Sequence, residues 1–375
     1  MRASLSPPRV VQLIPPGPGG VHDCAWALQG EWHKLGIVSQ VLTLTAEEGR
    51  RLDLGDGLLG RRVGGLGTSA APAIVLHYSG YGYAQRGLCA WLVTALRRLR
   101  QGRQGLLGPA RVVVVFHELF ANGPPWRSAF WLGGLQAGIA RELQGLADAS
   151  WTTTSAHAQW LLANGAAAPN LQVAPVFSNI PEASISTIWA QRDPTLVVFG
   201  AAATRRRALQ ALQRGGLAQR LFRDLGVQAL IEVGDGDSGA WRAPGLPHRV
   251  VGRLAADEVG ALLQASRWGL IAYPRHLLAK SSVFAAYAVQ GCLPINLDAS
   301  GHDADGLCQG REYVGWPLGA GLRAKVGTAP RPVAPDGPAM TAGLHRWYQP
   351  HRLQHQAQSL AKMALPGFDA SRGLL

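Results

Sequence analysis

Three glycines stand where a strand-type run passes into a helical pattern. The apolar run 9–14 is followed by prolines and by Gly17, Gly19 and Gly20, and the helical pattern begins directly afterwards. Glycines let the backbone approach a ligand closely, and the free N–H groups and dipole of a helix start favour an anion. The pattern therefore indicates an anion site. A tight turn without a ligand is the alternative, because the third glycine and the acidic residue of the dinucleotide fingerprint are absent.

His117 and Glu118 directly follow the apolar run 111–116. Open α/β sheets bind ligands beyond the carboxyl ends of their strands, so this position favours a chemical role for both side chains. His77 and Tyr78 end another strand-type run in the same way and could line the same pocket. A histidine that belongs only to the core is the competing interpretation.

A second polar group stands at an expected helix start. Lys280, Ser281 and Ser282 follow a strand that ends at Pro274. Hydroxyl and N–H groups at a helix N-terminus, with an ammonium group beside them, can bind a phosphate. Capping of the helix by serine is the alternative, although a lysine within an otherwise apolar segment speaks against it.

The remaining polar motifs do not indicate a metal. Asp235 and Asp237 have a spacing that could hold a divalent ion on a phosphate. However, they lie in the segment GDGDSG directly after an expected strand, and such a Gly-Asp-Gly sequence is typical of the turn that ends a strand. The cysteines form no CxxC pair and no Cys/His ligand spacing, so we expect reduced thiols and neither a metal nor another cofactor. The cysteines are Cys24, Cys89, Cys292 and Cys308.

Strands that alternate with helical patterns must position these residues. Strand-type runs at 73–78 and 111–116 belong to the first half, and the alternation restarts at 195–200. Continuous apolar strands separated by helices predict parallel sheets covered on both faces. We therefore predict the α/β class with two Rossmann-like, doubly wound domains. The expected parts are a first domain at 1–180, a linker at 181–195, a second domain at 196–338, and a helical segment at 339–375 that can pack back on the first domain.

Length and composition agree with two globular domains. The chain has 375 residues, of which 47% are apolar and 16% charged, which excludes a disordered polymer. The sequence shows neither a signal-peptide core nor an uninterrupted apolar run long enough to cross a bilayer. We expect a cytoplasmic protein.

The net charge of +13 favours phosphate-bearing ligands. We expect no nucleic-acid partner, because no helix-turn-helix, zinc-finger spacing or basic aromatic motif is present. Peripheral contact with an anionic membrane could involve Arg97, Arg98 and Arg100 beside Trp91 and Leu92, with a solvated helix end as the alternative.

Six segments, taken in order, carry a resemblance to a known family: GPGGVHDCA, FHELF, FGAAATRRRAL, IEVGDGD, VVGRLAADEVGALLQASRWGLIAYP and AYAVQGCLPI. This series resembles the retaining, nucleotide-sugar-dependent glycosyltransferases of GT-B fold, family 4-like, over most of residues 9–297. The resemblance implies two Rossmann-like domains that face each other across a cleft, the first on the acceptor side and the second binding the donor.

The resemblance also implies roles for individual residues. Gly19 and Gly20 would contact the donor phosphate or sugar, and His117 would face the transferred sugar, with Glu118 beside it. A basic pair in the second domain would neutralise the diphosphate. Ala201 stands where an arginine is usual, so Arg205 or Arg206 would take its place, with Lys280, Ser281 and Ser282 supplying the rest of the phosphate site.

The main departure from the family pattern concerns a pair of glutamates. The paired glutamates that hold the sugar and the ribose correspond to Leu278 and Ala286, which are both apolar. We expect transfer of a sugar from a nucleoside diphosphate donor to a saccharide or lipid-linked acceptor. The alternative is a non-catalytic GT-B-like protein that binds a sugar, a nucleotide or a partner.

Overall fold

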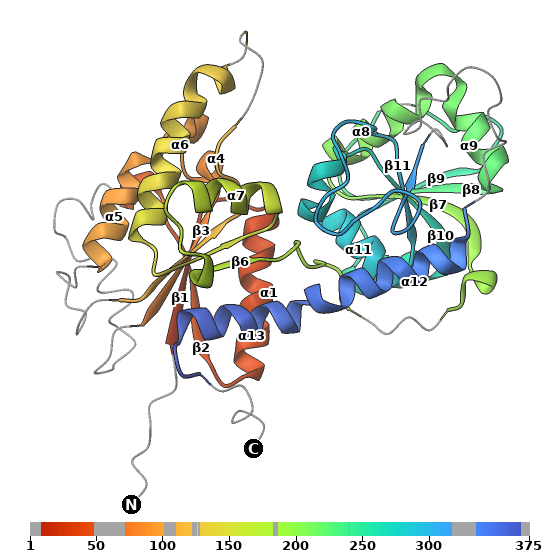
Figure 1. Cartoon of the computed structure of the whole chain (residues 1–375). Helices are drawn as coiled ribbons and strands as arrows, with labels where there is room; N and C mark the ends of the chain where they lie inside the picture. The colour runs from red at the N-terminus through yellow and green to blue at the C-terminus, as the bar shows by residue number, and fades with distance from the viewer. Residues whose placement is uncertain are drawn as a thin grey trace, which may run out of the picture. The chain divides into compact units, whose positions relative to one another are not determined.

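The structure, a computed structural model, describes residues 9–48, 72–100, 110–121, 126, 128–182, 187–239, 241–316 and 335–368, without the side chains of 128–130. Contacts within the chain divide it into two compact units. Unit 1 comprises Met1–Ala174 and Leu353–Leu375, and unit 2 comprises Pro175–Arg352. Figure 1 shows that each unit is built on a parallel sheet with helices packed on it.

The sheet of unit 1 has the strand order β2-β1-β3-β4-β5-β6, and every neighbouring pair is parallel. The central strands β3 and β4 are apolar and buried on both faces, which is typical of parallel sheets. The strands are β1 (Arg9–Ile14), β2 (Val38–Thr43), β3 (Ala73–Tyr78), β4 (Val112–Phe116), β5 (Ala149–Thr152) and β6 (Leu171–Val173).

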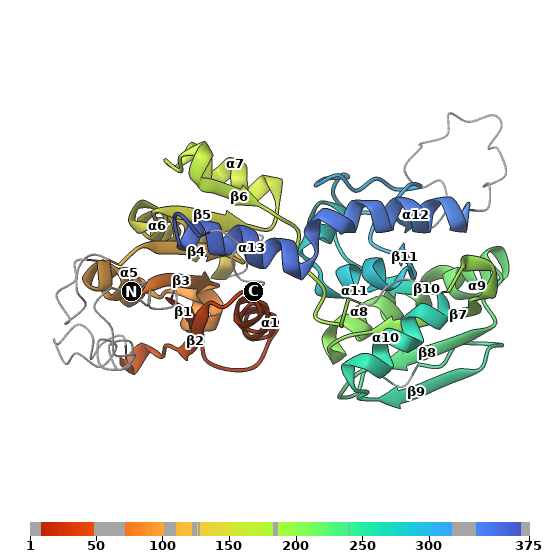
Figure 2. The same ribbon diagram turned by 90° about the horizontal axis from the view of Figure 1, so that it is seen from below.

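Helices cover both faces of this sheet. One core joins Leu13, Leu76 and Val114 of the strands to apolar residues of α5 and α6. Helices α1 and α13 pack on the sheet as well, as both views show (Figures 1 and 2). The helices are α1 (Gly20–Lys34), α4 (Gly80–Tyr83), α5 (Ala90–Arg100), α6 (Ser128–Leu146), α7 (Ser155–Ala163) and α13 (Leu353–Ala364), with 3-10 turns at Gln85–Gly87 and Ala168–Asn170.

Unit 2 has a second parallel sheet, in the order β12-β11-β10-β7-β8-β9. The strands are β7 (Asp193–Phe199), β8 (Ala229–Val233), β9 (His248–Gly252), β10 (Ser266–Ile271), β11 (Leu293–Asn296) and β12 (Val314–Gly315). The helices are α8 (Ala202–Gln213), α9 (Leu217–Leu225), α10 (Ala256–Ala265), α11 (Ser282–Gln290) and α12 (Gly337–Tyr348), with 3-10 turns at Trp189–Gln191, Arg214–Gly216, Arg275–Lys280 and Gln349–His351.

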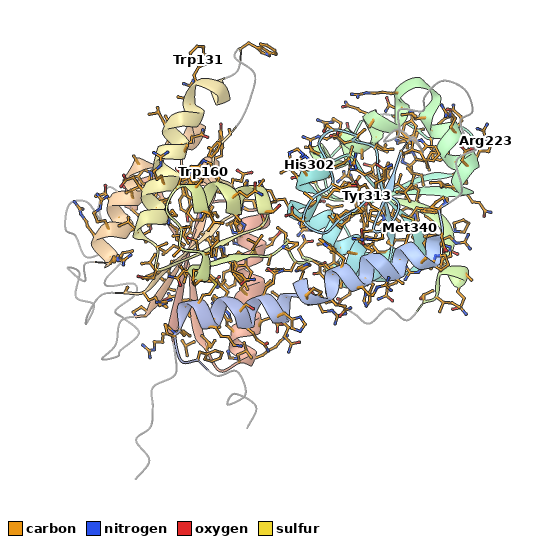
Figure 3. All side chains as sticks on the ribbon, viewed as in Figure 1. Trp131, Trp160, Arg223, His302, Tyr313 and Met340 are labelled. Atoms are coloured by element: carbon orange, nitrogen blue, oxygen red, sulfur yellow. The ribbon has the colours of Figure 1, made fainter. Side chains whose placement is uncertain are left out.

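The interior of unit 2 consists of two apolar clusters, one containing α8 and α9 and the other containing α10 and α11. Tyr313 belongs to the second cluster, whereas Arg223 lies on the exposed side of α9 and points outwards (Figure 3). Helix α11 is buried along almost its whole length, since Val283 through Gln290 are all shielded from solvent. It is a core helix rather than a surface helix.

The C-terminal helical pattern is two helices. Helix α12 packs in unit 2, a 3-10 turn with Pro350 follows, and α13 packs in unit 1. Trp32 of α1 is buried, and its Nε1 donates to the carbonyl oxygen of Ala357 in α13 at 2.8 Å. Arg111 Nε donates to the carbonyl oxygen of Met363 at 2.6 Å. A proline at the junction removes a helical donor, which separates the two helices.

The predicted fold class is confirmed: both units are α/β and doubly wound. Their arrangement across a cleft stays a prediction. No helix among the residues that the structure describes is long and apolar enough to span a membrane.

Candidate active site

The strand order of unit 1 places a topological switch point between β1 and β3. From β1 the chain first crosses to β2 on one side, and it later continues at β3 on the other. Doubly wound sheets bind ligands in the crevice beyond the carboxyl ends of the two strands at such a point. The glycine segment follows β1 and Ser79 follows β3, so both lie at this edge.

The start of α1 is exposed and lacks a side-chain cap. Its N-cap residue is Gly19, which has no side chain, and the first N–H groups of a helix have no partner within it. A Cβ atom added at Gly17, Gly19 or Gly20 would meet no atom of the described residues within 4 Å. Gly17 and Gly19 adopt φ values of 92° and 152°, which disfavour other residues. The backbone here is therefore open to a ligand such as an anion.

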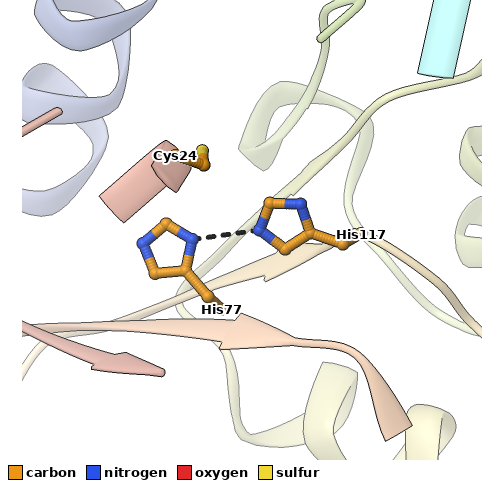
Figure 4. A group of neighbouring side chains, drawn as sticks. All are labelled: Cys24, His77 and His117. Atoms are coloured by element: carbon orange, nitrogen blue, oxygen red, sulfur yellow. Dashed lines mark hydrogen bonds between the residues drawn. The ribbon is translucent and has the colours of Figure 1, made fainter. Parts of the chain in front are cut away.

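A chain of hydrogen bonds runs along this edge from β1 to the residue after β4. His77 Nε2 is 2.9 Å from Gln12 Oε1, and His77 Nδ1 is 3.0 Å from His117 Nε2. The sheet register explains the contact, because Gln12 pairs with Val75 and His77 pairs with Val115, so the three side chains share one face of the sheet. Figure 4 shows the two imidazoles facing each other.

The chain fixes where the protons of the two histidines lie. Gln12 Nε2 donates to the carbonyl oxygen of Ala25 and to Ser39 Oγ, so Gln12 Oε1 is the acceptor for His77 Nε2–H. Burial, and then the charge of His117, hold the pKa of His77 well below its ordinary value. A neutral His77 accepts at Nδ1, and His117 therefore carries a proton on Nε2.

Two more side chains lie beside the histidines. Cys24, one turn into α1, has its Sγ within 4.8 Å of the facing nitrogens of His77 and His117, which places the start of α1 next to His117. Burial and the neighbouring Asp23 raise the pKa of the Cys24 thiol to about 12, so the thiol is protonated at neutral pH. Glu118 is exposed and accepts a hydrogen bond from Ser79 Oγ at 3.3 Å.

Unit 2 has its own switch point, between β7 and β10. Helix α8 begins directly after β7, with Gly200 at a φ of 121° and with Ala201 as an N-cap residue that has no polar side chain. The first N–H groups of α8 are thus available to an anion. Arg206, in the next turn, is exposed, and its Nη2 donates to the carbonyl oxygen of Asp237 at 2.8 Å.

Arg205, which was expected at the diphosphate, lies in the interior of unit 2. It is fully buried, and its Nε donates to Glu232 Oε1 at 2.9 Å. Its two terminal nitrogens donate to carbonyl oxygens of the turns at Gly200 and at 235–236. A Cβ atom at Gly234 would overlap Arg205, so a glycine is needed there. Arg205 therefore stabilises the loops at this edge and does not face a ligand.

The second polar group is also partly structural. Ser281 is the N-cap residue of α11, and its Oγ accepts a hydrogen bond from the N–H of Phe284 at 3.2 Å. This serine therefore caps the helix, which was the alternative to a phosphate site. Lys280 ends the preceding 3-10 turn and is half-buried, and Ser282 is the first residue of α11. The carboxylate at Asp237 accepts from Gly239 N, as expected for a turn.

The positions that correspond to the family glutamates lie in the core. Leu278 is 1% exposed and Ala286 is 0% exposed. A carboxylate at either position would be buried among apolar side chains, which is costly for an unpaired charge. The departure from the family pattern is thus built into the packing of unit 2.

The helix proposed for membrane contact uses its apolar face inside unit 1. Leu92 of α5 is buried in the core, and Trp91 packs against the core and contacts Tyr83. Arg97 pairs with Glu142 at 3.1 Å. Trp91 and Leu92 are thus used to cover the sheet, and contact of the arginines of this helix with an anionic membrane stays a prediction.

The structure brings His117, Glu118 and the glycine segment to one edge of unit 1, and it places Arg206, Lys280 and Ser282 in unit 2. Sequence reasoning missed the contribution of Gln12. Its signal was a polar residue inside the apolar run 9–14, where a buried amide must find partners. Cys24 was recognised only as an isolated thiol.

No family model matches the sequence, and no curated protein is significantly similar to it. Among solved structures, Anabaena HepE with UDP-glucose is 13% identical, with a TM-score of 0.48 over 97% of this chain and 96% of that chain. An alpha-glucosyltransferase with UDP is 11% identical, with a TM-score of 0.46 over 95% of both chains. A putative UDP-N-acetylglucosamine 2-epimerase from Listeria monocytogenes is 10% identical, with a TM-score of 0.43 over 79% of this chain and 80% of that chain.

Proposed function

We propose that the protein is a glycosyltransferase that moves a sugar from a nucleoside diphosphate donor to a saccharide or lipid-linked acceptor. Retention of configuration follows the family resemblance. One observation carries the proposal. His117, fixed in one tautomer by His77 and Gln12, lies beside the uncapped start of α1 at the switch point of a doubly wound sheet.

In unit 1, His117 would orient the sugar or the acceptor, because its contact with His77 fixes the orientation of its ring. The glycine backbone at Gly19 and Gly20 would contact the donor phosphate or sugar, because the first N–H groups of α1 favour an anion. Glu118 would act as a second acceptor at the same edge. None of these groups serves as a nucleophile in this proposal.

In unit 2, the start of α8 with Arg206, together with Lys280 and Ser282, would bind the diphosphate. Negative charge grows on the diphosphate as the glycosidic bond breaks, and fixed dipoles and cations stabilise such a charge. This proposal needs neither a metal nor another cofactor for transfer. It also places the protein in the cytoplasm, where nucleotide sugars would be its substrates.

A panel of nucleotides and nucleotide sugars tests the proposal in two steps. Thermal unfolding identifies the donor, because a ligand that binds only the folded state raises the unfolding temperature with its concentration. Incubation with the labelled donor and with saccharide or lipid-linked acceptors then detects transfer or hydrolysis. Stabilisation by a nucleoside diphosphate together with turnover is expected, and the absence of both would overturn the proposal.

A non-catalytic binding protein is the second candidate, and the burial of Leu278 and Ala286 favours it. Without the two carboxylates, a bound sugar would lack the partners that hold its hydroxyls in the resembled family. This candidate predicts stabilisation by a nucleotide sugar without product in the same experiment. Any turnover above that of a His117→Asn control rejects it.

A further inference from the structure

Three side chains with metal-ligating atoms converge in unit 1. Cys24 comes from α1, His77 from the end of β3, and His117 from the residue after β4. The Sγ atom of Cys24 and one ring nitrogen of each histidine all lie within 4.8 Å of one another (Figure 4). Among the residues that the structure describes, this is the one group of three or more cysteine, histidine or acidic side chains close enough to share an ion.

The spacing of the atoms is close to that of a tetrahedral site. Typical zinc distances place two ligating nitrogens about 3.4 Å apart and a nitrogen and a sulfur about 3.6 Å apart. The two imidazole nitrogens are 3.0 Å apart in the structure. Side-chain movements of about an ångström therefore complete the geometry of three ligands that leave a fourth position for solvent.

Gln12 supplies the outer partner that such a site requires. Histidines that bind a metal usually donate their second N–H to an oxygen, which fixes the ring and the tautomer. His77 does so, because its Nε2–H is donated to Gln12 Oε1 at 2.9 Å and its Nδ1 lone pair faces His117 and Cys24. Gln12 is itself held by Ala25 and Ser39. His77 is thus oriented as a ligand before any ion arrives.

We propose that Cys24, His77 and His117 form a binding site for a divalent metal ion of the zinc class. One thiolate and two imidazoles are the ligand types that zinc prefers, whereas magnesium and calcium prefer oxygen. The proposal goes beyond the proposed transfer reaction and does not depend on it, because it concerns binding alone.

Metal binding requires a defined proton balance. The Cys24 thiol loses its proton to solvent, and the thiolate sulfur donates an electron pair to the ion. His77 binds through Nδ1 and keeps its Nε2 proton on Gln12. The proton of His117 moves from Nε2 to Nδ1, so that Nε2 can bind. Binding therefore releases about one proton per metal ion.

The site has a consequence for the transferase. With a metal bound, His117 Nε2 would lie on the ion. The hydrogen bond to His77 that orients its ring would then be lost. Zinc-class metals are therefore expected to inhibit turnover in the range in which they bind this site.

Titration of the whole protein with Co²⁺ tests the site without any activity. Cobalt reports on its ligands, and a sulfur-to-cobalt absorption band with tetrahedral visible bands is expected at one ion per chain. The Cys24→Ser variant should lose the sulfur band. Cys308→Ser is the matched control, because Cys308 is a similarly half-buried cysteine in unit 2. Its spectrum should equal that of the unchanged protein, and excess Zn²⁺ should remove the cobalt signal.

A second measurement covers the case in which a variant fails to fold. In the unchanged protein, Zn²⁺ should slow alkylation of Cys24 by iodoacetamide, read by mass spectrometry, and leave that of Cys308 unaffected. In Gln12→Leu, the affinity for Zn²⁺ should fall roughly 10- to 100-fold. Absent cobalt binding, a sulfur band that persists in Cys24→Ser, or equal alkylation with and without Zn²⁺ would each overturn the proposal.

Discussion

The two switch points use polar side chains in opposite ways. In unit 1, Gln12 and His77 hold His117 at the edge of the sheet, next to an open helix start. In unit 2, the buried Arg205 is paired with Glu232 and with the backbone of two turns. Polar groups in unit 1 orient a side chain toward a ligand, whereas those in unit 2 shape the loops around a helix start. Both units have an uncapped helix start at the switch point, and in unit 1 a hydrogen-bonded histidine also stands beside it.

The largest expected effect concerns the buried ion pair of unit 2. Arg205→Met removes the guanidinium partner of the buried Glu232 and leaves only Ser238 and His248 beside it, so the free energy of unfolding should fall by about 3–5 kcal/mol. Urea unfolding followed by circular dichroism measures it. Arg206→Met is the matched control, since it removes the same charge from an exposed neighbour and should change stability by less than about 0.5 kcal/mol. Equal effects of the two variants would contradict the division of roles.

His117 should show the reverse behaviour in unit 1. His117→Asn removes the imidazole that would orient the sugar or the acceptor, and turnover of the identified donor should fall by about 10²-fold with little change in stability. Steady-state rates and thermal unfolding on the same samples separate the two effects. His33→Asn, at an exposed position near the end of α1, serves as the control and should keep the full rate. A parallel loss of stability and rate would make His117 a core histidine.

The two open helix starts can be compared directly. A carboxylate at a helix start stabilises it by about 0.3–1 kcal/mol but repels a bound phosphate. Gly20→Asp in α1 and Ala203→Asp in α8 should therefore raise stability and weaken binding of the nucleoside diphosphate, measured by calorimetry. The corresponding Gly20→Ala and Ala203→Ser variants should keep the affinity. If Gly20→Asp leaves affinity unchanged, α1 does not contact the phosphate.

The smallest effect is a pH dependence of unit 2. Burial, and then the charge of Arg242, lower the pKa of His248, with Glu232 opposing the shift. Between the lowered pKa and the ordinary one, His248 is therefore protonated in the unfolded chain and neutral in the folded unit. Stability should decline as the pH falls below the ordinary histidine value of about 6.5, and level off below the lowered pKa. Urea unfolding at several pH values between these two pKa values measures how the free energy of unfolding changes with pH. His248→Gln should reduce that change.

The fold could be predicted from sequence because apolar strands and helical patterns alternate regularly in both halves. Burial of Arg205 could have been predicted as well, since it stands on the same helical face as Ala208, Leu209 and Leu212. The grouping of Cys24 with the two histidines could not, because it depends on strand register and on how α1 packs. Residues far apart in sequence meet there without any local spacing.

The return of α13 to unit 1 affects the order in which the units form during synthesis. Unit 2 is continuous in sequence and can complete its core without residues 353–364. Unit 1 meanwhile leaves Trp32 uncovered, with its indole N–H lacking the carbonyl oxygen of Ala357. A chain truncated after Arg352 should thus contain a finished second unit and an unfinished first one, which reverses the usual order from the N-terminus.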